Sequence, residues 1–381
     1  VLGRLAAEVN LGDGGSSNVH PTEVVTLRDG LSREWGEAVT YAADDVSIAD
    51  DADLCVVVVG YTAADEGEYL DAESFGALGH LFPPLPDLGE DPGPDSTDES
   101  STDTASEPQP EAAPDGGAGD EGRDSGAPGF LPGGDRRSLR LSEADEALVA
   151  AACERSDRVV VVVMGGSAIV APWLDEPAAV LQVWYPGCRG GLALADLLTG
   201  RTEPGGRLPF VMPRRAEDLV PFDPDATEVA YGLFHGQWHL DREGTEPMRP
   251  FGYGRGYADL DVAGTDGALV VSGDGTARLP ATVSNRSDRP GATVLFAFGG
   301  VPDSALERPP RRLVGFLRVP VAAGETVEVE VPIDLGVLDV RDGPEWLTEA
   351  GRYVVELATD AATVVDTRVV ERGEGRVRAV V

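Results

Sequence analysis

The chain has 381 residues and carries 67 acidic against 30 basic side chains, which gives a net charge of −37. All 30 of those basic residues are arginine, because the sequence contains no lysine. So negative a chain repels phosphate backbones and anionic lipid, which argues against nucleic-acid binding and binding at a membrane surface. No apolar run approaches the roughly 18 residues that a membrane-spanning helix needs.

Cysteine and histidine are too sparse to indicate a disulfide framework or a metal centre. The three cysteines form no CxxC pair, and there are only four histidines. His235 and His239 are four residues apart but have no third ligand nearby, so ordinary packing is the preferred interpretation. The sequence therefore predicts no metal and no cofactor.

The negative charge has two sources. Residues 84–129 hold thirteen acidic side chains and one arginine, which leaves a net charge of −25 on the rest of the chain. An acidic surface with arginine in place of lysine is typical of a protein that works in strong salt, where a Debye length of about 3 Å at 1 M screens self-repulsion. We therefore expect a salt-adapted, halophilic protein. A GC-rich genome combined with one acidic tail is the alternative.

Neither a charged n-region nor an apolar h-region follows the first residue of the given sequence. The first residue is not Met, and Val1-Leu2-Gly3-Arg4 is typical of the clipped end of a buried strand. We expect that the natural N-terminus is missing, so the compartment of this soluble protein, cytoplasmic or secreted, stays open.

The first part of the chain alternates strand and helix patterns. Short, β-branched apolar runs bounded by Gly, Pro or Asp predict strands buried on both faces at Leu54–Val59, Val159–Met164 and Val180–Tyr185. Helical spacing, with Ser142 as the N-cap of the first helix, predicts helices at Ser142–Arg155 and Leu192–Leu198. This order indicates an α/β domain with a mostly parallel sheet over residues 1–215.

The remaining segments divide by composition. Residues 84–129 have almost no large apolar side chain, which predicts a disordered insert within the α/β domain. Residues 216–263 are rich in aromatics, Gly and Pro and are expected to form an ordered connector packed on both neighbours. Residues 264–381 predict a β-sandwich, with strand-like runs at Ala268–Val271, Ala281–Val283, Thr293–Ala297, Val327–Val331 and Tyr353–Leu357.

Three carboxylates crowd the loop that follows the first predicted strand. Asp65, Glu66 and Glu68 lie within four residues, where the carboxyl end of a parallel strand places ligand sites. Like charges so close raise the pKa of at least one carboxyl group, which suits a general acid. From charge alone, a solvated acidic loop is the stronger interpretation.

Several motifs resemble one family when they are taken together and in order. They read VVVVGYTAADEGEY, GGDRRSL, VVVVVMGGSAIV, VLQVWYPGCRGGLALADLLTGRTEPGGRLPF and PFGYGRGY. This series resembles the C-terminal half of family-3 glycoside hydrolases of the β-glucosidase type. Residues 264–381 resemble the fibronectin type III-like domain that ends many of these enzymes, so the resemblance covers nearly all the chain except the acidic insert.

The resemblance implies an α/β sandwich followed by a fibronectin-like domain, preceded in the family by a (β/α)8 barrel that carries the aspartate nucleophile. The loop at 65–69 then contributes the acid/base glutamate, with Glu68 as the first choice and Glu66 as the second. Glu68 is followed directly by Tyr69, without the Gly that many relatives have between the two, and this departure leaves the choice between Glu68 and Glu66 open. The candidates for substrate contact are Tyr69, Asp65, Ser16 and Ser17. Asp135 and Arg136 are candidates for a structural ion pair that holds the loop near the site.

The function so implied is retaining hydrolysis of a β-glucoside or oligosaccharide, in which a barrel domain or subunit is a required partner. We expect the chain alone to be inactive, and its barrel-facing surface to be less acidic and more apolar than the rest. The alternatives are a non-catalytic carbohydrate-binding or structural accessory chain that docks to a separate barrel subunit, and a truncated product with no function. A nucleotide-binding fold is weaker still, because the Gly-rich loop at 12–17 does not spell GxGxxG and a chain without lysine has no P-loop.

Overall fold

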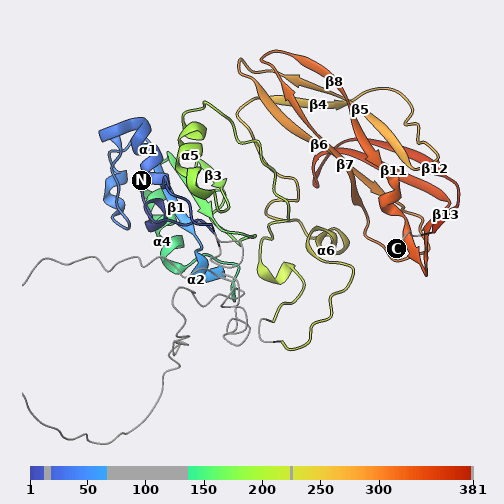
Figure 1. Ribbon diagram of the computed structural model, residues 1–381, viewed down its shortest axis with the longest axis horizontal. Helices are drawn as coiled ribbons and strands as arrows, with labels where there is room; N and C mark the ends of the chain where they lie inside the picture. Colours follow the sequence, from blue (N-terminus) through green and yellow to red (C-terminus); the bar gives the residue numbers. More distant parts are fainter. Residues whose placement is uncertain (13–18, 67–135, 224–225, 379–381) are drawn as a thin grey trace, which may run out of the picture.

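The computed structural model describes residues 1–12, 19–66, 136–223 and 226–378. Its N-terminal part is built on a parallel sheet of three strands in the order β1-β2-β3 (Figure 1). The strands are β1 (Cys55–Gly60), β2 (Val159–Met164) and β3 (Ala179–Gln182), and the first two are buried along their whole length. Leu2 extends the sheet through a parallel bridge to Val57.

Alternate residues of the sheet feed two separate cores. Val57, Val59 and Val161 point into a core that includes Val149 and Ala152 of helix α4 (Glu143–Arg155). Val56, Val58 and Val162 lie in the opposite core, against helices α1 (Leu27–Trp35) and α5 (Gly190–Leu198). Because helices cover both faces, β1 and β2 are continuously apolar rather than alternating, as the sequence predicted. The prediction for 180–185 is wrong in part, since β3 ends at Gln182 and its residues are half-buried or exposed.

Helices α1 and α5 approach each other closely at two glycines. A Cβ atom on Gly30 would lie 1.9 Å from the carbonyl oxygen of Gly191, so no larger residue fits at this contact. The N-cap prediction for α4 is confirmed, since the Ser142 hydroxyl accepts a hydrogen bond from the Asp145 amide at 3.1 Å. Helix α5 also confirms the predicted helix at 192–198, although it begins at Gly190.

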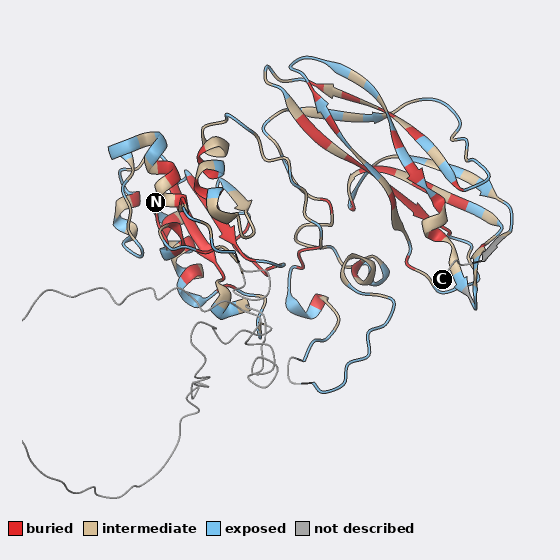
Figure 2. Ribbon diagram, in the orientation of Figure 1, coloured by how far each residue is buried: buried red, intermediate tan, exposed pale blue. Residues whose placement is uncertain are grey.

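The C-terminal part is an antiparallel β-sandwich. One sheet has the order β12-β11-β6-β7 and the other β4-β5-β8, with a small third sheet β13-β10-β9 (Figure 1). Their inner faces enclose a core that includes Tyr353, Leu295 and Val283, and the buried positions follow the strands in Figure 2. The strands are β4 (Leu260–Gly264), β5 (Thr276–Asn285), β6 (Gly291–Gly300), β7 (Arg312–Val321), β8 (Thr326–Asp334), β9 (Val340–Asp342), β10 (Glu345–Thr348), β11 (Gly351–Asp360), β12 (Thr363–Arg372) and β13 (Gly375–Arg378).

One predicted strand in this region is wrong. Residues 268–271 form no strand, and Val270 is 78% exposed. Leu269 and Val271 of this run still pack against the sandwich core without pairing as a strand. The runs at 281–283, 293–297, 327–331 and 353–357 all lie inside strands. The order of the two units, a parallel α/β unit followed by a fibronectin-like sandwich, is as the sequence predicted.

The segment between the two units contains helix α6 (Gly236–Glu243) and packs unevenly. Phe251 lies against Phe296 and Phe298 of the sandwich, with ring centroids 5.8 and 6.3 Å apart. Phe222, in contrast, is 55% exposed, so the expectation that all the connector aromatics are packed is wrong. Among the described residues, no helix is long and apolar enough to cross a membrane.

Candidate functional site

The candidate site begins where β1 ends. Gly60 closes the strand, and two residues later the chain enters the four-residue helix α2 (Ala63–Glu66). The Asp65 carboxylate accepts hydrogen bonds from the Thr62 amide at 2.8 Å and from the Thr62 hydroxyl at 2.9 Å. Asp65 therefore caps the turn at the start of α2, while its neighbour Glu66 points toward the sheet.

Glu66 joins three segments that are remote in the sequence. Its Oε1 accepts hydrogen bonds from the Tyr185 hydroxyl at 2.6 Å and from the Gly166 amide. Its Oε2 lies 3.2 Å from Nε of Arg136, and the Glu66 side chain is only 11% exposed. Gly166 follows β2 and Tyr185 follows β3, so the cluster gathers the carboxyl ends of all three parallel strands, where α/β sheets place their ligand sites.

Arg136 is held through Nε, Nη2 and the face of its guanidinium, whereas Nη1 is buried without a hydrogen-bond partner among the described residues. Its guanidinium lies 4.1 Å above the centroid of the Tyr61 ring and donates from Nη2 to the Ser167 hydroxyl and, at 3.0 Å, to the Ala168 carbonyl oxygen. The side chain is 8% exposed. Stacking on the aromatic face and the fork of hydrogen bonds together set the direction of Nε, which faces Glu66.

Burial changes the acidity of the two tyrosines at the site. The pKa of Tyr185 is raised far above its ordinary value of 10.0, first by burial and then by its hydrogen bond to Glu66 and the negative charge there. Burial also raises the pKa of Tyr61, partly offset by Arg136. Both phenols therefore stay protonated, and Tyr185 acts as a hydrogen-bond donor to Glu66 over the whole physiological range.

The residues proposed from sequence are only partly described. Asp65, Glu66 and Arg136 lie at the carboxyl end of β1, and the structure brings Glu66 and Arg136 into contact. The other five candidates lie outside the described residues: Ser16, Ser17, Glu68, Tyr69 and Asp135.

Sequence reasoning missed the role of Tyr185. The pattern Trp184-Tyr185-Pro186-Gly187 is typical of packing at a strand end, and Trp184 does pack on Phe210 with ring centroids 5.3 Å apart. Trp184, however, has φ 56°, a left-handed conformation that a bulky residue rarely adopts. Such strained backbone often marks a functional site. A Trp before the Tyr at a strand end is the signal available in the sequence.

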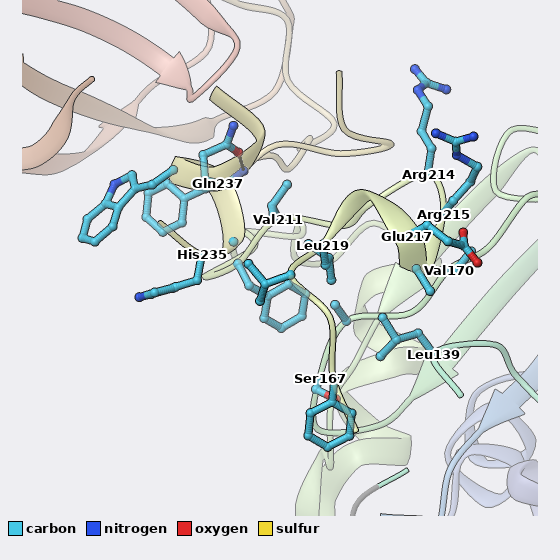
Figure 3. Close-up of a pocket in the computed structure, with 18 of the residues that line it drawn as sticks. Leu139, Ser167, Val170, Val211, Arg214, Arg215, Glu217, Leu219, His235 and Gln237 are labelled. Carbon is cyan, nitrogen blue, oxygen red and sulfur yellow. Dashed lines mark hydrogen bonds between the residues drawn. The ribbon is translucent and has the colours of Figure 1, made fainter. Parts of the chain in front are cut away.

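A cavity of about 1460 Å³ opens beside the cluster. Arg136 lines it from the α/β unit. Ser167 lines it from the same unit, and His235 and Gln237 line it at the start of α6 (Figure 3). The lining is mostly apolar and includes the exposed aromatics Phe222 and Tyr231. Such a cavity at a junction between structural units has the character of a ligand or domain contact. No group of three or more metal-ligating side chains occurs among the residues that the structure describes.

Residues 96–257 match the glycosyl hydrolase family 3 C-terminal domain, and residues 293–361 match the fibronectin type III-like domain. The chain carries a family 3 C-terminal domain. The strand β1 precedes the matched range but pairs with β2 in register, Val57 against Val161, so it belongs to the same sheet. The resemblance drawn from the motifs is confirmed: the chain resembles the C-terminal part of family 3 glycoside hydrolases.

Curated relatives carry glycosidase names. A β-glucosidase of Rhizobium radiobacter is 36% identical over 246 residues, which is 60% of this chain and 30% of the relative. An exo-α-(1→6)-L-arabinopyranosidase of Bifidobacterium longum is 31% identical over 243 residues, 62% of this chain and 32% of the relative. The chain thus spans about a third of the length of these relatives.

Solved structures share the fold. β-Glucosidase 3B of Thermotoga neapolitana, in complex with glucose, superposes with a TM-score of 0.72 at 20% identity, covering 99% of this chain and 51% of that one. A Bifidobacterium adolescentis GH3 β-glucosidase gives a TM-score of 0.72 at 23% identity, covering 98% and 48%. The arrangement of α/β unit, connector and sandwich is therefore the one found in these β-glucosidases.

Proposed function

We propose that this chain supplies the acid/base loop of a retaining β-glucosidase-like site whose nucleophile lies on a (β/α)8 barrel. The observation that carries the proposal is the carboxylate of Glu66, held at the carboxyl end of the parallel sheet beside the cavity. The family 3 C-terminal domain and the names of the relatives support it.

The chemistry requires two carboxyl groups. In retaining hydrolysis one carboxylic acid protonates the leaving oxygen, while a carboxylate about 5–5.5 Å away attacks the anomeric carbon. In our proposal the first group is Glu68, with Glu66 as the second candidate, and the barrel provides the other. Both oxygens of Glu66 already accept from Arg136, Tyr185 or the Gly166 amide, which keeps Glu68 as the first choice.

The connector supports a barrel as partner, as a domain of the same protein or as a separate subunit. Four large apolar side chains are exposed between residues 222 and 233, two of them on the cavity: Phe222, Val229, Tyr231 and Leu233. A cluster of this kind on so acidic a protein is typical of a surface that another domain covers.

Release of nitrophenol from aryl glycosides tests the proposal. We expect no turnover by the chain alone, and turnover of the β-glucoside when the barrel is present. Glu68→Gln should then lower kcat/KM for cellobiose, whose poor leaving group needs protonation, far more than kcat/KM for the aryl glucoside, with Glu66→Gln as the paired variant. Turnover by the isolated chain that Glu68→Gln removes would contradict the requirement for a barrel.

The sugar is proposed to be glucose, with pentosides as rivals. One relative is an arabinopyranosidase, so the panel should contain the 4-nitrophenyl β-glucoside, β-xyloside and α-L-arabinopyranoside. A kcat/KM that is highest on either pentoside would overturn the choice of glucose without affecting the choice of reaction.

We also propose that the protein is salt-adapted. The net charge of −37 and the absence of lysine support this, since screening relieves self-repulsion in concentrated salt. A Tm that rises between 0.05 and 1 M NaCl is the expected result.

A further inference from the structure

Two side chains converge on Glu66 from opposite sides. The Tyr185 hydroxyl donates to Oε1 at 2.6 Å, and Nε of Arg136 lies 3.2 Å from Oε2. We propose that Tyr185 and Arg136 are positioning residues of the acid/base loop and act through the Glu66 carboxylate. This inference rests on the proposed function and adds to it the groups that fix the loop in place.

Tyr185 is set for this task by its backbone. The left-handed Trp184 (φ 56°) turns the chain just before it, and the Trp184 carbonyl oxygen accepts from the Gly165 amide at 3.3 Å, which ties this turn to the end of β2. The adjacent Gly166 donates to the same Glu66 oxygen as Tyr185. The hydroxyl therefore has a fixed direction, and Glu66 is its only hydrogen-bond partner among the described residues.

Arg136 is set by its surroundings rather than by its backbone. The stack on Tyr61 and the bonds to Ser167 and Ala168 hold the guanidinium in one orientation. Tyr61 is in turn fixed, because its hydroxyl donates to the Arg140 carbonyl oxygen at 2.7 Å. A lysine would keep the positive charge at this position. It would lose the guanidinium fork, whose N–H groups contact Glu66, Ser167 and Ala168.

The cluster sits where positioning has the greatest effect. Glu66 and Arg136 flank segment 67–135 in the sequence, and their ion pair brings these two positions together. That segment contains Glu68. An acid/base group must be held close to the productive geometry, and groups locked by neighbours achieve this better than a free loop.

The experiment compares two substrates in the protein assembled with its barrel. General acid assistance matters most for a poor leaving group, so Tyr185→Phe and Arg136→Lys are assayed on cellobiose and on 4-nitrophenyl β-glucoside. We expect each variant to lower kcat/KM for cellobiose by about tenfold or more, part of the usual contribution of general acid catalysis, and to change the aryl glucoside less than about threefold. Tyr257→Phe is the matched control, since it also removes one tyrosine hydroxyl that donates a hydrogen bond, here to the Leu197 carbonyl oxygen at 3.0 Å. It should leave kcat/KM unchanged for both substrates.

Two outcomes overturn the inference. One is an equal loss on both substrates, which marks a merely structural role. The other is unchanged kcat/KM for cellobiose in both variants. Failure of the proposed function itself looks different, because the wild-type assembly then turns over neither substrate.

Discussion

Nε of Arg136 lies 3.2 Å from Oε2 of Glu66, although the two residues stand on opposite sides of segment 67–135. Both side chains are nearly buried, at 8% and 11% exposure. A charge pair removed from water to this degree is costly to break, because loss of one partner leaves the other charged and buried. The pair therefore matters to the stability of the α/β unit as well as to its proposed chemistry.

Arg136→Met should lower the free energy of unfolding by about 3–5 kcal/mol, the range for breaking a buried pair. Urea unfolding of the chain, followed by circular dichroism, measures it. Arg201→Met is the control, because Arg201 pairs with both Glu34 and Asp196 in contact with solvent, so its loss should lower the free energy of unfolding far less than Arg136→Met does. Equal effects of the two substitutions would show that burial does not govern these pairs.

Tyr185 should make the chain sensitive to alkali. Burial and the hydrogen bond to Glu66 raise the pKa of Tyr185 above the ordinary 10.0, so the folded state holds the phenolic proton more tightly than the unfolded state. The resulting stability is fully present below pH 10 and is lost as the pH rises above it. Unfolding in urea between pH 9 and 11 should show a smaller loss for Tyr185→Phe than for the wild type. Parallel curves for the two proteins would refute this.

Much of the α/β unit could be predicted from residue patterns alone. Six-residue apolar strands such as Val159–Met164 can be predicted because burial on both faces requires an apolar side chain at every position. Helix α1 was not predicted, because Gly30 and the polar residues around Leu27 and Leu31 weaken its apolar stripe. Gly30 is there for close contact with Gly191, which is a tertiary reason that no local pattern contains.

The site was predictable only in part. The position of Glu66 at a strand end followed from the sequence, since the carboxyl ends of parallel strands meet at one edge. The identity of its partners depends on strand order and on the conformation of single residues. Tyr185 reaches Glu66 because β3 lies beyond β2 and because Trp184 turns the chain, and neither fact can be read from spacing.

A substitution at Asp145 should raise stability at neutral pH, whereas Arg136→Met should lower it. It is 9% exposed in the first turn of α4, where burial raises its pKa and the Gly60 amide at 3.4 Å only partly compensates. A raised pKa contributes stability at acidic pH that is lost as the pH rises through the folded value. Asp145→Asn keeps an acceptor for Gly60 without the charge. We therefore expect the variant to gain stability relative to wild type between pH 4 and pH 7 in urea unfolding. A difference that shrinks over that range would contradict the assignment.

Glu203 couples the α/β unit to the sandwich. Its carboxylate accepts hydrogen bonds from the amides of Tyr257 at 3.0 Å, of Ala258 at 3.3 Å and of Ala292 in β6. Glu203→Ala leaves these amides without an acceptor, which should cost about 1–3 kcal/mol. Because the contact joins two units, we expect calorimetry to show their unfolding transitions drawing apart. Glu328→Ala, on the exposed side of β8, is the control. Transitions that shift together in both variants would mean that Glu203 does not couple the units.

Salt should stabilise this chain rather than weaken it. Exposed ion pairs lose strength as salt is added, but each contributes at most about 1 kcal/mol. Against them stands the repulsion among 67 acidic side chains that only 30 arginines can offset. Raising NaCl to 1 M shortens the Debye length to about 3 Å and removes most of that repulsion between exposed charges. We therefore expect Tm to rise between 0.05 and 1 M NaCl, and to rise equally in KCl. Sulfate also stabilises proteins because it is excluded from their surface, so it separates this effect from charge screening. If Tm rises in sulfate but stays constant or falls in both chlorides, charge screening does not stabilise the chain. The interpretation of the acidic surface as a salt adaptation would then fail.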